Sequence, residues 1–265
     1  MGSIPPAVDS YASRADLLEK EPRKAHKETN VEKMSLPPGW GADSLTEFLE
    51  KAYRNRVTRL ENENDWVQQL VKLDGCFTKI VRDPWVDPAN QIAALLFHRS
   101  HAAYRAACEH AMAGQVADVF PLARHCLESA GYALHIYKKP DLGEVWLRHG
   151  LSAKATTAVR NKFAYGKIKK TIEEANRDVG KVFVGLYERF IEFGGHPNAR
   201  SITGSLKITD ESSRRVYKHI YLHRDGPAAN YGLMSTAQAG VCALEILQEA
   251  FRERFEGLAR PIHEA

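Results

Sequence analysis

Apolar residues along most of this chain recur every three or four positions, which is the spacing of one face of an α-helix. The first helix is expected to begin at Leu45, because Asp43 or Ser44 can cap it and Glu47 is placed to complete a capping box. A second helix is expected over 65–81. The apolar faces of these two helices carry Leu45, Phe48, Leu49 and Ala52, and then Trp66, Leu70, Leu73 and Phe77.

The middle of the chain predicts a central pair of helices. Residues 89–113 are rich in alanine and apolar enough to be central, and Gly114 ends this segment. Residues 116–137 form the next helix, in which Pro121 either marks the first true turn or kinks the axis. One stripe of that helix carries Ala123, Cys126, Leu127, Ala130, Leu134 and Tyr137.

Further segments complete the helical pattern. Residues 142–163 form a weaker helix that Gly150 interrupts, and residues 228–255 form a long final helix. Between them lies the cleanest amphipathic face of the chain, which Gly194 and Gly195 end with the left-handed conformations of a C-cap. That face carries Val179, Val182, Phe183, Leu186, Phe190 and Phe193.

A change to β-branched and aromatic residues marks 205–209 and 216–222, on either side of a polar segment. This pattern is typical of a β-hairpin. The fold class we expect is therefore all-α, a multi-helix bundle with a small β-hairpin near residues 205–222. Residues 1–40 are polar, evenly charged and interrupted by prolines, so we expect an N-terminal arm, flexible or packed, and then a single helical domain over 41–265.

The composition is that of a folded, soluble chain. Of its 265 residues, 44% are hydrophobic and 26% are charged, which excludes wholesale disorder, a collagen-like repeat and a disulfide scaffold. No run of about 18 apolar residues is present, so no membrane span is expected. The four cysteines are far apart, which argues against a structural zinc site, and the first residues lack the pattern of a signal peptide. We therefore expect a cytoplasmic protein with reduced thiols.

Positive charge is concentrated in one stretch. Residues 138–170 contain nine Lys or Arg against Asp141 and Glu144, a net charge of +7 within a chain whose total is +4. Such a surface can attract RNA or an acidic partner. A solvated segment that connects two helices explains the same charges, because runs of charge are common on protein surfaces.

The motifs of several enzyme classes are missing from the sequence. The chain has no GxxxxGK[ST] phosphate loop, no GxGxxG, no GxSxG and no HExxH, and we expect no cofactor. Aromatic residues are only 9% of the chain. We expect no alternation of basic and aromatic residues of the kind that stacks single-stranded nucleic acid.

Three groups of polar residues could carry chemistry, and the first lies within 89–113. Helical spacing places four polar side chains there on one strip. Two imidazoles and a carboxylate could bind a divalent metal, and a polar seam against a neighbouring helix explains the strip equally well, so we assign no metal ligand on this pattern alone. The four residues are His98, His101, Arg105 and Glu109.

The second group lies on the following helix. Arg124 and Glu128 are four residues apart and can pair, and Gly131 and His135 continue the same strip. A glycine inside a helix costs about 1 kcal/mol relative to alanine, so Gly131 indicates that a backbone or a ligand comes close. If the Arg–Glu pair is buried, it indicates either a site or a structural lock.

The third group surrounds the end of the amphipathic helix near residue 190. Arg189 lies on that helix, and His196 follows the glycine pair that ends it. The negative end of the helix dipole favours a protonated imidazole at that place. An Arg and a His held together can cleave RNA, since the His transfers protons and the Arg stabilises charge that develops on the phosphate.

The Arg124-x-x-x-Glu128 helix, followed by a helix that leads into His196-Pro197-Asn198, resembles a broad set of bacterial helical proteins. Some of these proteins are grouped with abortive-infection proteins and with the HEPN superfamily of helical ribonucleases and nucleotide-binding modules. The signature of catalytic HEPN domains is an Arg and, after a short spacer, a His. Arg189 and His196 match this signature with six residues between them, and the resemblance spans residues 89–200.

This resemblance implies a metal-independent ribonuclease. His196 would act as general acid and base, with Arg189 or Arg124 stabilising the phosphate and Glu128 beside them in one cleft. We further expect a homo-oligomer that forms through an apolar helix face. The alternative is a non-catalytic interaction or scaffold protein, in which Arg124–Glu128 is a structural pair and His196 only shapes a loop.

Overall fold

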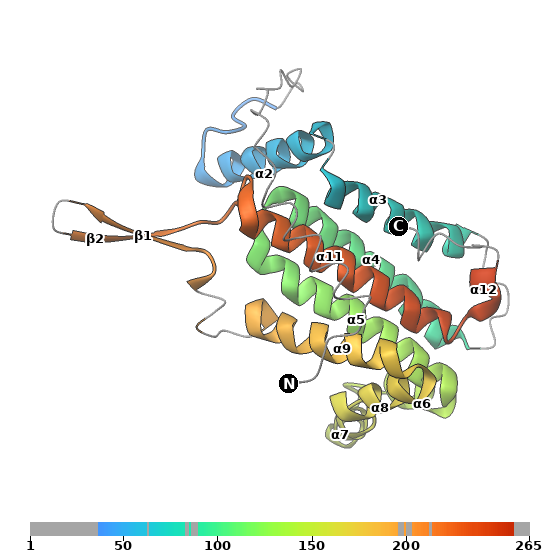
Figure 1. Cartoon of the computed structure of the whole chain (residues 1–265). Coiled ribbons are helices and arrows are strands. Elements are labelled where there is room, and N and C mark those ends of the chain that lie inside the picture. The colour runs from blue at the N-terminus through green and yellow to red at the C-terminus, as the bar shows by residue number, and fades with distance from the viewer. Residues whose placement is uncertain are drawn as a thin grey trace. The chain divides into compact units, whose positions relative to one another are not determined.

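The computed structural model describes residues 37–62, 64–82, 85, 90–195, 199, 203–211 and 214–256. The chain divides into two compact units, Met1–Pro38 and Gly39–Ala265. The arm expected over 1–40 therefore lies almost wholly outside the described residues. The described part of the second unit is an all-α bundle with a two-stranded antiparallel hairpin, as the apolar pattern predicts (Figure 1).

Helices form most of the described chain. In chain order the helical elements are α2 (Ser44–Glu61), α3 (Asp65–Arg82), α4 (Gln91–Ala113), α5 (Val116–Lys138), α6 (Asp141–Leu147), α7 (Ala153–Lys162), α8 (Tyr165–Ala175), α9 (Arg177–Phe190), the π-helix η1 (Ile191–Gly195), α11 (Gly226–Gln248) and α12 (Arg252–Glu256). The strands are β1 (Leu206–Glu211) and β2 (Arg214–His219).

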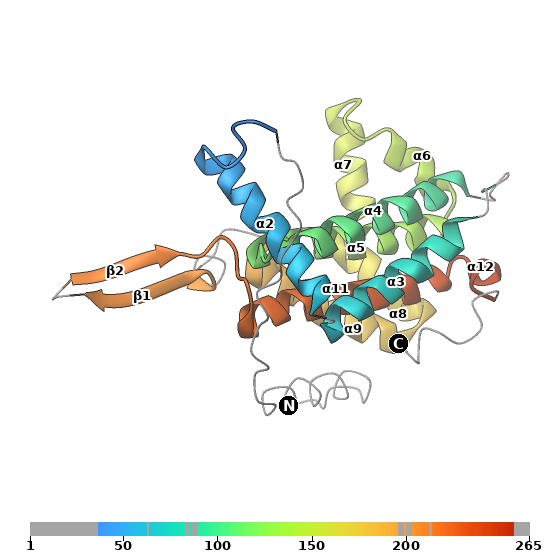
Figure 2. The same ribbon diagram turned by 90° about the horizontal axis from the view of Figure 1, so that it is seen from above.

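Helix α5 forms the centre of the bundle. Only Gly114 and Gln115 separate it from α4, so these two helices run antiparallel and side by side, and α11 and α9 also pack on α5 (Figures 1 and 2). Gly114 has a φ of 88°, and a side chain there would collide with the carbonyl oxygen of His223. The predicted stripe of α5 is buried at Ala123, Cys126, Leu127, Ala130 and Leu134, whereas Tyr137 is partly exposed.

A buried arginine joins α2 to the rest of the bundle. The guanidinium of Arg59 donates to four backbone carbonyls, in the last turn of α4 and in the segment before α11. Burial lowers the pKa of Arg59 to about 10, so the group stays charged at neutral pH. Its positive charge also lies next to the negative, C-terminal end of the α4 dipole, which is a favourable arrangement. The four acceptors are the carbonyl oxygens of Ala111, Met112 (2.6 Å), His223 (2.6 Å) and Arg224 (3.0 Å).

The start of α2 agrees with the predicted cap but not with the predicted buried face. Asp43 caps the helix, whereas Glu47 pairs with Lys51 at 2.5 Å. Leu45 and Leu49, both placed on the apolar face by their spacing, are 64% and 39% exposed. The reason is that α2 bonds to the end of α4 through its C-terminal half, so its first turns extend beyond the core.

Three predicted helical features differ in the structure. The pattern does not predict α8, because Ile168 and Ile172 are the apolar residues on its buried side and two such residues make a weak signal. The final helix ends at Gln248, and the short α12 follows, where one helix was predicted to run to Phe255. Gly194 does not have a left-handed backbone but lies within η1, so the predicted C-cap is wrong at that residue.

The hairpin confirms the predicted change of pattern near residues 205–222. Strands β1 and β2 pair antiparallel, with Leu206 opposite His219 and Ile208 opposite Tyr217. In both ribbon views the hairpin projects away from the helices (Figures 1 and 2). The bundle therefore leaves much of this two-stranded sheet in solvent.

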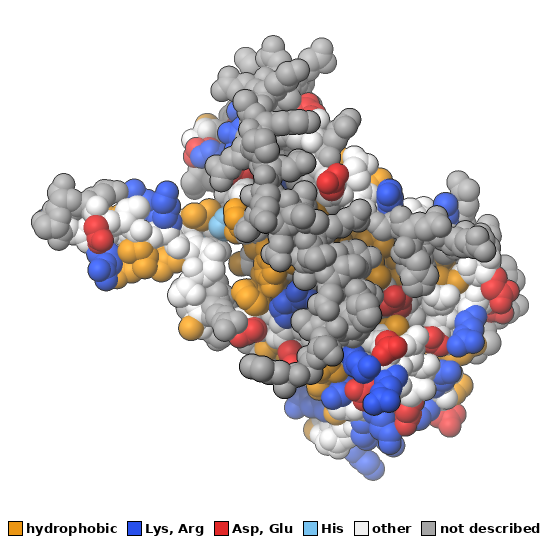
Figure 3. All heavy atoms as spheres, in the orientation of Figure 1, with side chains coloured by type: hydrophobic (Ala, Val, Ile, Leu, Met, Phe, Trp, Pro, Cys, Tyr) orange, Lys and Arg blue, Asp and Glu red, His pale blue; other side chains and the backbone are white. Residues whose placement is uncertain are grey.

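The basic stretch over 138–170 forms α6, α7 and the beginning of α8. Figure 3 shows Lys and Arg side chains gathered at this end of the unit, with acidic side chains among them. Arg148, Lys169 and Lys170 each pair with an acid four residues away, so part of the charge is compensated locally. Within the described ranges, no helix combines the length with the apolar character that crossing a bilayer requires.

Candidate functional site

A charged pair on α5 meets a tyrosine of α9. Arg124 Nε lies 3.5 Å from Glu128 Oε1, one helical turn away, as the spacing predicts. The hydroxyl of Tyr187 donates a 2.9 Å hydrogen bond to the same carboxylate oxygen. The side chains of Arg124 and Glu128 keep 22% and 31% of their surface exposed, so they are not enclosed. We call Arg124, Glu128 and Tyr187 the α5–α9 site.

A pocket of about 100 Å³ adjoins Glu128. In its wall, the rings of Tyr165 and Tyr187 stack with their centroids 4.5 Å apart. The ring centroids of Tyr132 and Phe163 lie 5.0 Å apart. The hydroxyl of Tyr165 is buried and has no hydrogen-bond partner among the described residues, so it could bond to a molecule in the pocket. The residues that line the pocket are Glu128, Tyr132, Phe163, Tyr165, Ile168, Phe183 and Tyr187.

The phenols of this pocket are held in the protonated form. Burial raises the pKa of Tyr187, and the charge of Glu128 raises it further. Burial also raises the pKa of both Tyr132 and Tyr165. All three hydroxyls therefore carry their protons at neutral pH and can donate hydrogen bonds, as Tyr187 does to Glu128.

The π-helix η1 packs against the first turns of α5. The backbone of Gly194 comes so close to α5 that an added Cβ would lie 2.6 Å from the carbonyl oxygen of Ala117 and 3.3 Å from Pro121. Ala117 and Pro121 lie about two turns and one turn before Arg124. A glycine is required at position 194 because the backbone of α5 comes so close. Single π-turns occur frequently at functional sites. His196, two residues further along the chain, lies outside the described residues.

Arg189 belongs to a different group of side chains. Its Nη2 donates a 2.8 Å hydrogen bond to Oε1 of Gln238 on α11. Arg189 and Tyr187 are two residues apart on α9, so their side chains leave the helix about 200° apart. Of the four predicted site residues, the structure thus brings Arg124 and Glu128 together and directs Arg189 toward α11, and it does not describe His196.

A histidine that no sequence motif marks lies next to Arg124. Nε2 of His125 accepts a 2.9 Å hydrogen bond from Nε of Arg99 on α4. Burial and the charge of Arg99 lower the pKa of His125, so its ring is neutral at pH 7 with the proton on Nδ1. Arg99 and His125 are 26 residues apart and meet only because α4 and α5 pair, which is why helical spacing did not reveal them.

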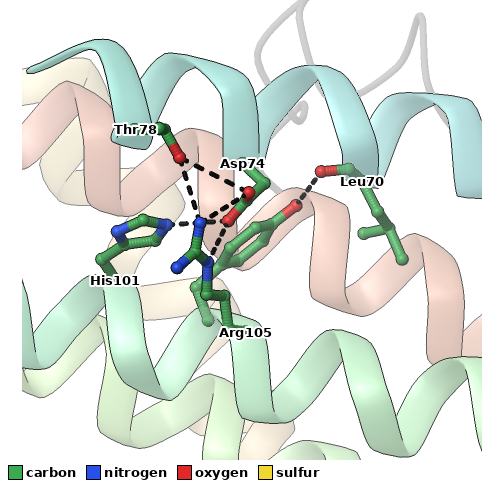
Figure 4. Close-up of polar contacts among 6 residues, drawn as sticks. Leu70, Asp74, Thr78, His101 and Arg105 are labelled. Carbon is green, nitrogen blue, oxygen red and sulfur yellow. Dashed lines mark hydrogen bonds and ion pairs between the residues drawn. The ribbon is translucent and has the colours of Figure 1, made fainter. Parts of the chain in front are cut away.

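The predicted strip on α4 does not form a metal site. Nε2 of His101 lies 2.7 Å from Oδ1 of Asp74 on α3, and Arg105 binds both carboxylate oxygens of Asp74 at 2.7 and 3.0 Å (Figure 4). Glu109 pairs with Arg56 at 2.6 Å. No three His, Cys, Asp or Glu side chains in the described part of the chain are arranged to hold a metal ion. The metal hypothesis is therefore wrong, and the strip is a polar seam against neighbouring helices.

The charges of this seam are settled by burial and hydrogen bonding. Burial lowers the pKa of His101 more than its hydrogen bond to Asp74 raises it, and its ring stacks on Phe77 at 4.9 Å. Burial acts to raise the pKa of Asp74, but the bonds from Arg105 and His101 lower it further than that. Asp74 is therefore an anion that accepts from a neutral imidazole and from a guanidinium, which is a stable structural arrangement.

Gly131 and His135, the rest of the predicted α5 strip, face α8. An added Cβ at Gly131 would lie 2.6 Å from a methyl carbon of Ile168, so the close neighbour that this glycine indicated is a side chain of α8. His135 is buried, with Nδ1 2.7 Å from the hydroxyl of Thr171 and Nε2 3.2 Å from the carbonyl oxygen of Lys162. Because the carbonyl can only accept, Nε2 carries the proton, and both partners suit a neutral ring. These two residues pack α8 onto α5.

No family model, curated protein or solved structure matches the chain. The α5–α9 site is the candidate functional site because it combines three features. A cation and a carboxylate lie together, both are partly exposed, and the carboxylate of Glu128 lines an aromatic pocket.

Proposed function

We propose that this protein is a metal-independent ribonuclease that works at the α5–α9 site with His196. The observation that carries the proposal is the exposure of Arg124 and Glu128 beside a pocket. A pair that serves only to lock helices together belongs in apolar surroundings, since an accessible pair contributes about 0–1 kcal/mol to stability. A partly exposed guanidinium, paired with a carboxylate that lines a pocket, suits a phosphate substrate.

Each residue of the proposed site has a role in cleavage. The 2′-hydroxyl of the ribose loses its proton and attacks the phosphorus, and the bond to the 5′-oxygen breaks as that oxygen gains a proton. We assign both proton transfers to His196 and the stabilisation of charge on the phosphate to Arg124. Tyr187 donates a hydrogen bond to the carboxylate of Glu128, and Glu128 forms an ion pair with Arg124. Tyr187 and Glu128 are therefore positioning residues for Arg124. We assign no role in cleavage to Arg189, whose Nη2 donates to Gln238 on α11.

The test is RNA cleavage by the purified full-length protein in excess EDTA. We expect the wild type to yield products with a 2′,3′-cyclic phosphate and a 5′-hydroxyl. The His196→Ala and Arg124→Ala variants should cleave at least about 100-fold more slowly. Arg189→Gln serves as the matched arginine control and should stay within about fivefold of the wild type.

A substrate control accompanies these variants. An oligonucleotide of the same sequence with 2′-deoxyribose should not be cleaved, because it lacks the attacking hydroxyl. No cleavage by the wild type, or equal cleavage by the wild type and the His196→Ala variant, removes the ribonuclease proposal.

A non-catalytic interaction or scaffold protein is the second candidate. The observation that favours it is that Oε1 of Glu128 contacts both Arg124 and Tyr187, so the same group bridges α5 and α9. If this bridge is its whole purpose, Tyr187→Phe lowers the free energy of unfolding and no form of the protein cleaves RNA. The two candidates are therefore separated by the same set of variants.

Two further expectations belong with this proposal. We place the protein in the cytoplasm, because its four cysteines are free thiols. We also expect copies to associate, since Leu45 and Leu49 leave an apolar surface on α2. Light scattering on the full-length protein measures the second expectation, and a monomeric mass contradicts it.

A further inference from the structure

The hairpin of β1 and β2 keeps apolar and aromatic side chains in solvent. At its base the backbone N–H of Ile220 donates to the carbonyl oxygen of Ser205 at 2.7 Å, and beyond that point the strands leave the bundle (Figures 1 and 2). Ile208 and Tyr217 lie opposite each other and are 52% and 60% exposed, and Tyr221 is 69% exposed. A two-stranded hairpin alone is marginally stable in water, so such exposure indicates a surface that a partner covers.

The hairpin is also cationic. Lys207 and Lys218 occupy directly opposed positions, an arrangement that costs stability in a sheet and becomes favourable when both face an anion. Figure 3 shows basic and hydrophobic side chains side by side on this projection. Asp210 lies 3.4 Å from Arg215 and offsets one positive charge. The charged residues of the two strands are Lys207, Arg214, Arg215 and Lys218 against Asp210 and Glu211.

Basic and aromatic residues lie close together along β2 and the segment that follows it. From Arg214 the order is Arg, Arg, Val, Tyr, Lys, His, Ile and Tyr, and the rings of His219 and Tyr221 lie 4.6 Å apart. Neighbouring residues of a strand point to opposite faces of the sheet. The bundle covers neither face of the hairpin fully, so basic and aromatic side chains of this segment both reach solvent.

We propose that β1, β2 and Tyr221 bind single-stranded RNA. Unpaired bases stack on Tyr217 and Tyr221, and the strand passes around the edge of the ribbon, so that phosphates lie against Lys207 and Lys218 on the opposite face from Tyr217. Exposed rings select a single strand because the faces of its bases are open, whereas the bases of a duplex already stack on one another. The positive charge selects a polyanion over a second copy of this hairpin, which would be repelled. Binding here does not require cleavage at the α5–α9 site.

The basic stretch over 138–170 is the competing location for RNA. It carries more formal charge, and cations on both surfaces have acidic neighbours: Arg148, Lys169 and Lys170 in this stretch, and Arg215 on the hairpin. The hairpin combines its charge with exposed aromatic rings, and this combination is what single strands bind best. The stretch also supplies a control, because Lys154 and Arg160 are exposed cations on α7.

The experiment measures the fluorescence anisotropy of a labelled oligouridylate of roughly 15 nucleotides, which is one binding-site length. The protein is the full chain carrying His196→Ala, so that the RNA stays intact. Adding Tyr217→Ala should weaken binding about 5- to 100-fold, whereas Tyr217→Phe keeps the ring and should stay within about twofold. Thermal unfolding of each variant confirms that the bundle remains folded.

The lysines are tested through the salt dependence of the same binding. Changing both Lys207 and Lys218 to Gln should reduce the slope of log affinity against log salt by about 1.4, which corresponds to two phosphate contacts. Changing both Lys154 and Arg160 to Gln removes the same charge from α7 and should leave that slope unchanged.

Several results would overturn the proposal. These are no binding of the oligouridylate, equal binding by Tyr217→Ala and its parent, equal affinity for duplex RNA, or a loss seen only in the α7 control. An oligomer that Tyr217→Ala converts to a monomer with unchanged RNA affinity would show instead that the hairpin joins copies of the chain. RNA bound but never cleaved by the wild type rejects the ribonuclease proposal and leaves this one standing.

Discussion

Contacts between single residues separate what helical spacing can predict from what it cannot. The Arg124–Glu128 pair follows from a distance of four residues on one helix, and the structure confirms it. Tyr187, which bonds to the same carboxylate, is 59 residues away on another helix. Its part in the site depends on how α5 and α9 pack, and no periodicity along one chain contains that information. The link between Arg99 and His125 is of the same kind.

The phenol of Tyr187 provides a test of the α5–α9 site at this scale. Tyr187→Phe removes the hydrogen bond to Glu128 and keeps the ring that stacks on Tyr165. We expect the free energy of unfolding in urea to fall by about 1 kcal/mol, because a bond to a charged but partly exposed group is weaker than a buried one. Tyr217→Phe, on the exposed hairpin, should change stability by less than about 0.5 kcal/mol. Equal stability of Tyr187→Phe and the wild type would show that this hydroxyl does not hold Glu128.

Among the elements, long amphipathic helices are predicted best and short ones worst. α3, α4 and α5 begin and end within two residues of the expected positions, because each has a long apolar face and a clear stop signal. α8 was missed because it buries few apolar residues and lies in a basic stretch. The end of α11 was missed because the apolar residues continue through Phe251 although the helix does not. A periodic pattern shows which residues are buried and not whether the backbone between them is continuous.

The attachment of α2 can be tested at Arg59. Arg59→Met keeps much of the side-chain volume but leaves the carbonyl oxygens of Ala111, Met112 and His223 without their donor. We expect the free energy of unfolding to fall by about 3 kcal/mol or more. Arg54→Met is the matched control on the same helix, since Arg54 is exposed and pairs with Glu50, and it should cost less than about 0.5 kcal/mol. Similar losses for both variants would contradict the assigned role of Arg59.

Across the whole described unit, buried and half-buried histidines make the stability of the fold depend on pH. Burial is the largest cause of the lowered pKa of His101, His125, His135 and His223. As the pH falls to the ordinary histidine pKa, these four histidines therefore bind protons in the unfolded chain but remain neutral in the folded chain. These four groups contribute stability above that pKa, and the contribution is lost as the pH falls below it.

We therefore expect the urea concentration at the midpoint of unfolding to decrease as the pH is lowered from about 7.5 to about 5.5. His135→Gln should make this dependence shallower, even if it lowers stability at every pH, because one of the four groups is then absent. Midpoints measured by circular dichroism across this range check the expectation. A midpoint that is constant or that rises toward pH 5.5 would contradict it.

The fold class of the whole molecule could be predicted because it depends on apolar spacing summed over many residues. The placement of the hairpin could not, since alternating β-branched and aromatic residues predict strand pairing and not whether the pair packs on a helix. The exposed rings of Tyr217 and Tyr221 became visible as a surface only in three dimensions.

The π-helix η1 has a consequence for how this protein tolerates change in length. A π-turn is wound with one residue more than the α-helix it continues, as if one amino acid had been inserted after α9. Deleting a residue within Ile191–Gly195 would let α9 continue regularly, rotate the outgoing chain by about 100° and lift Gly194 from its seat against Ala117. Related chains that share this architecture should therefore accept varied side chains at Ile191 and Glu192, though not at Gly194, far more readily than a shortening by one position.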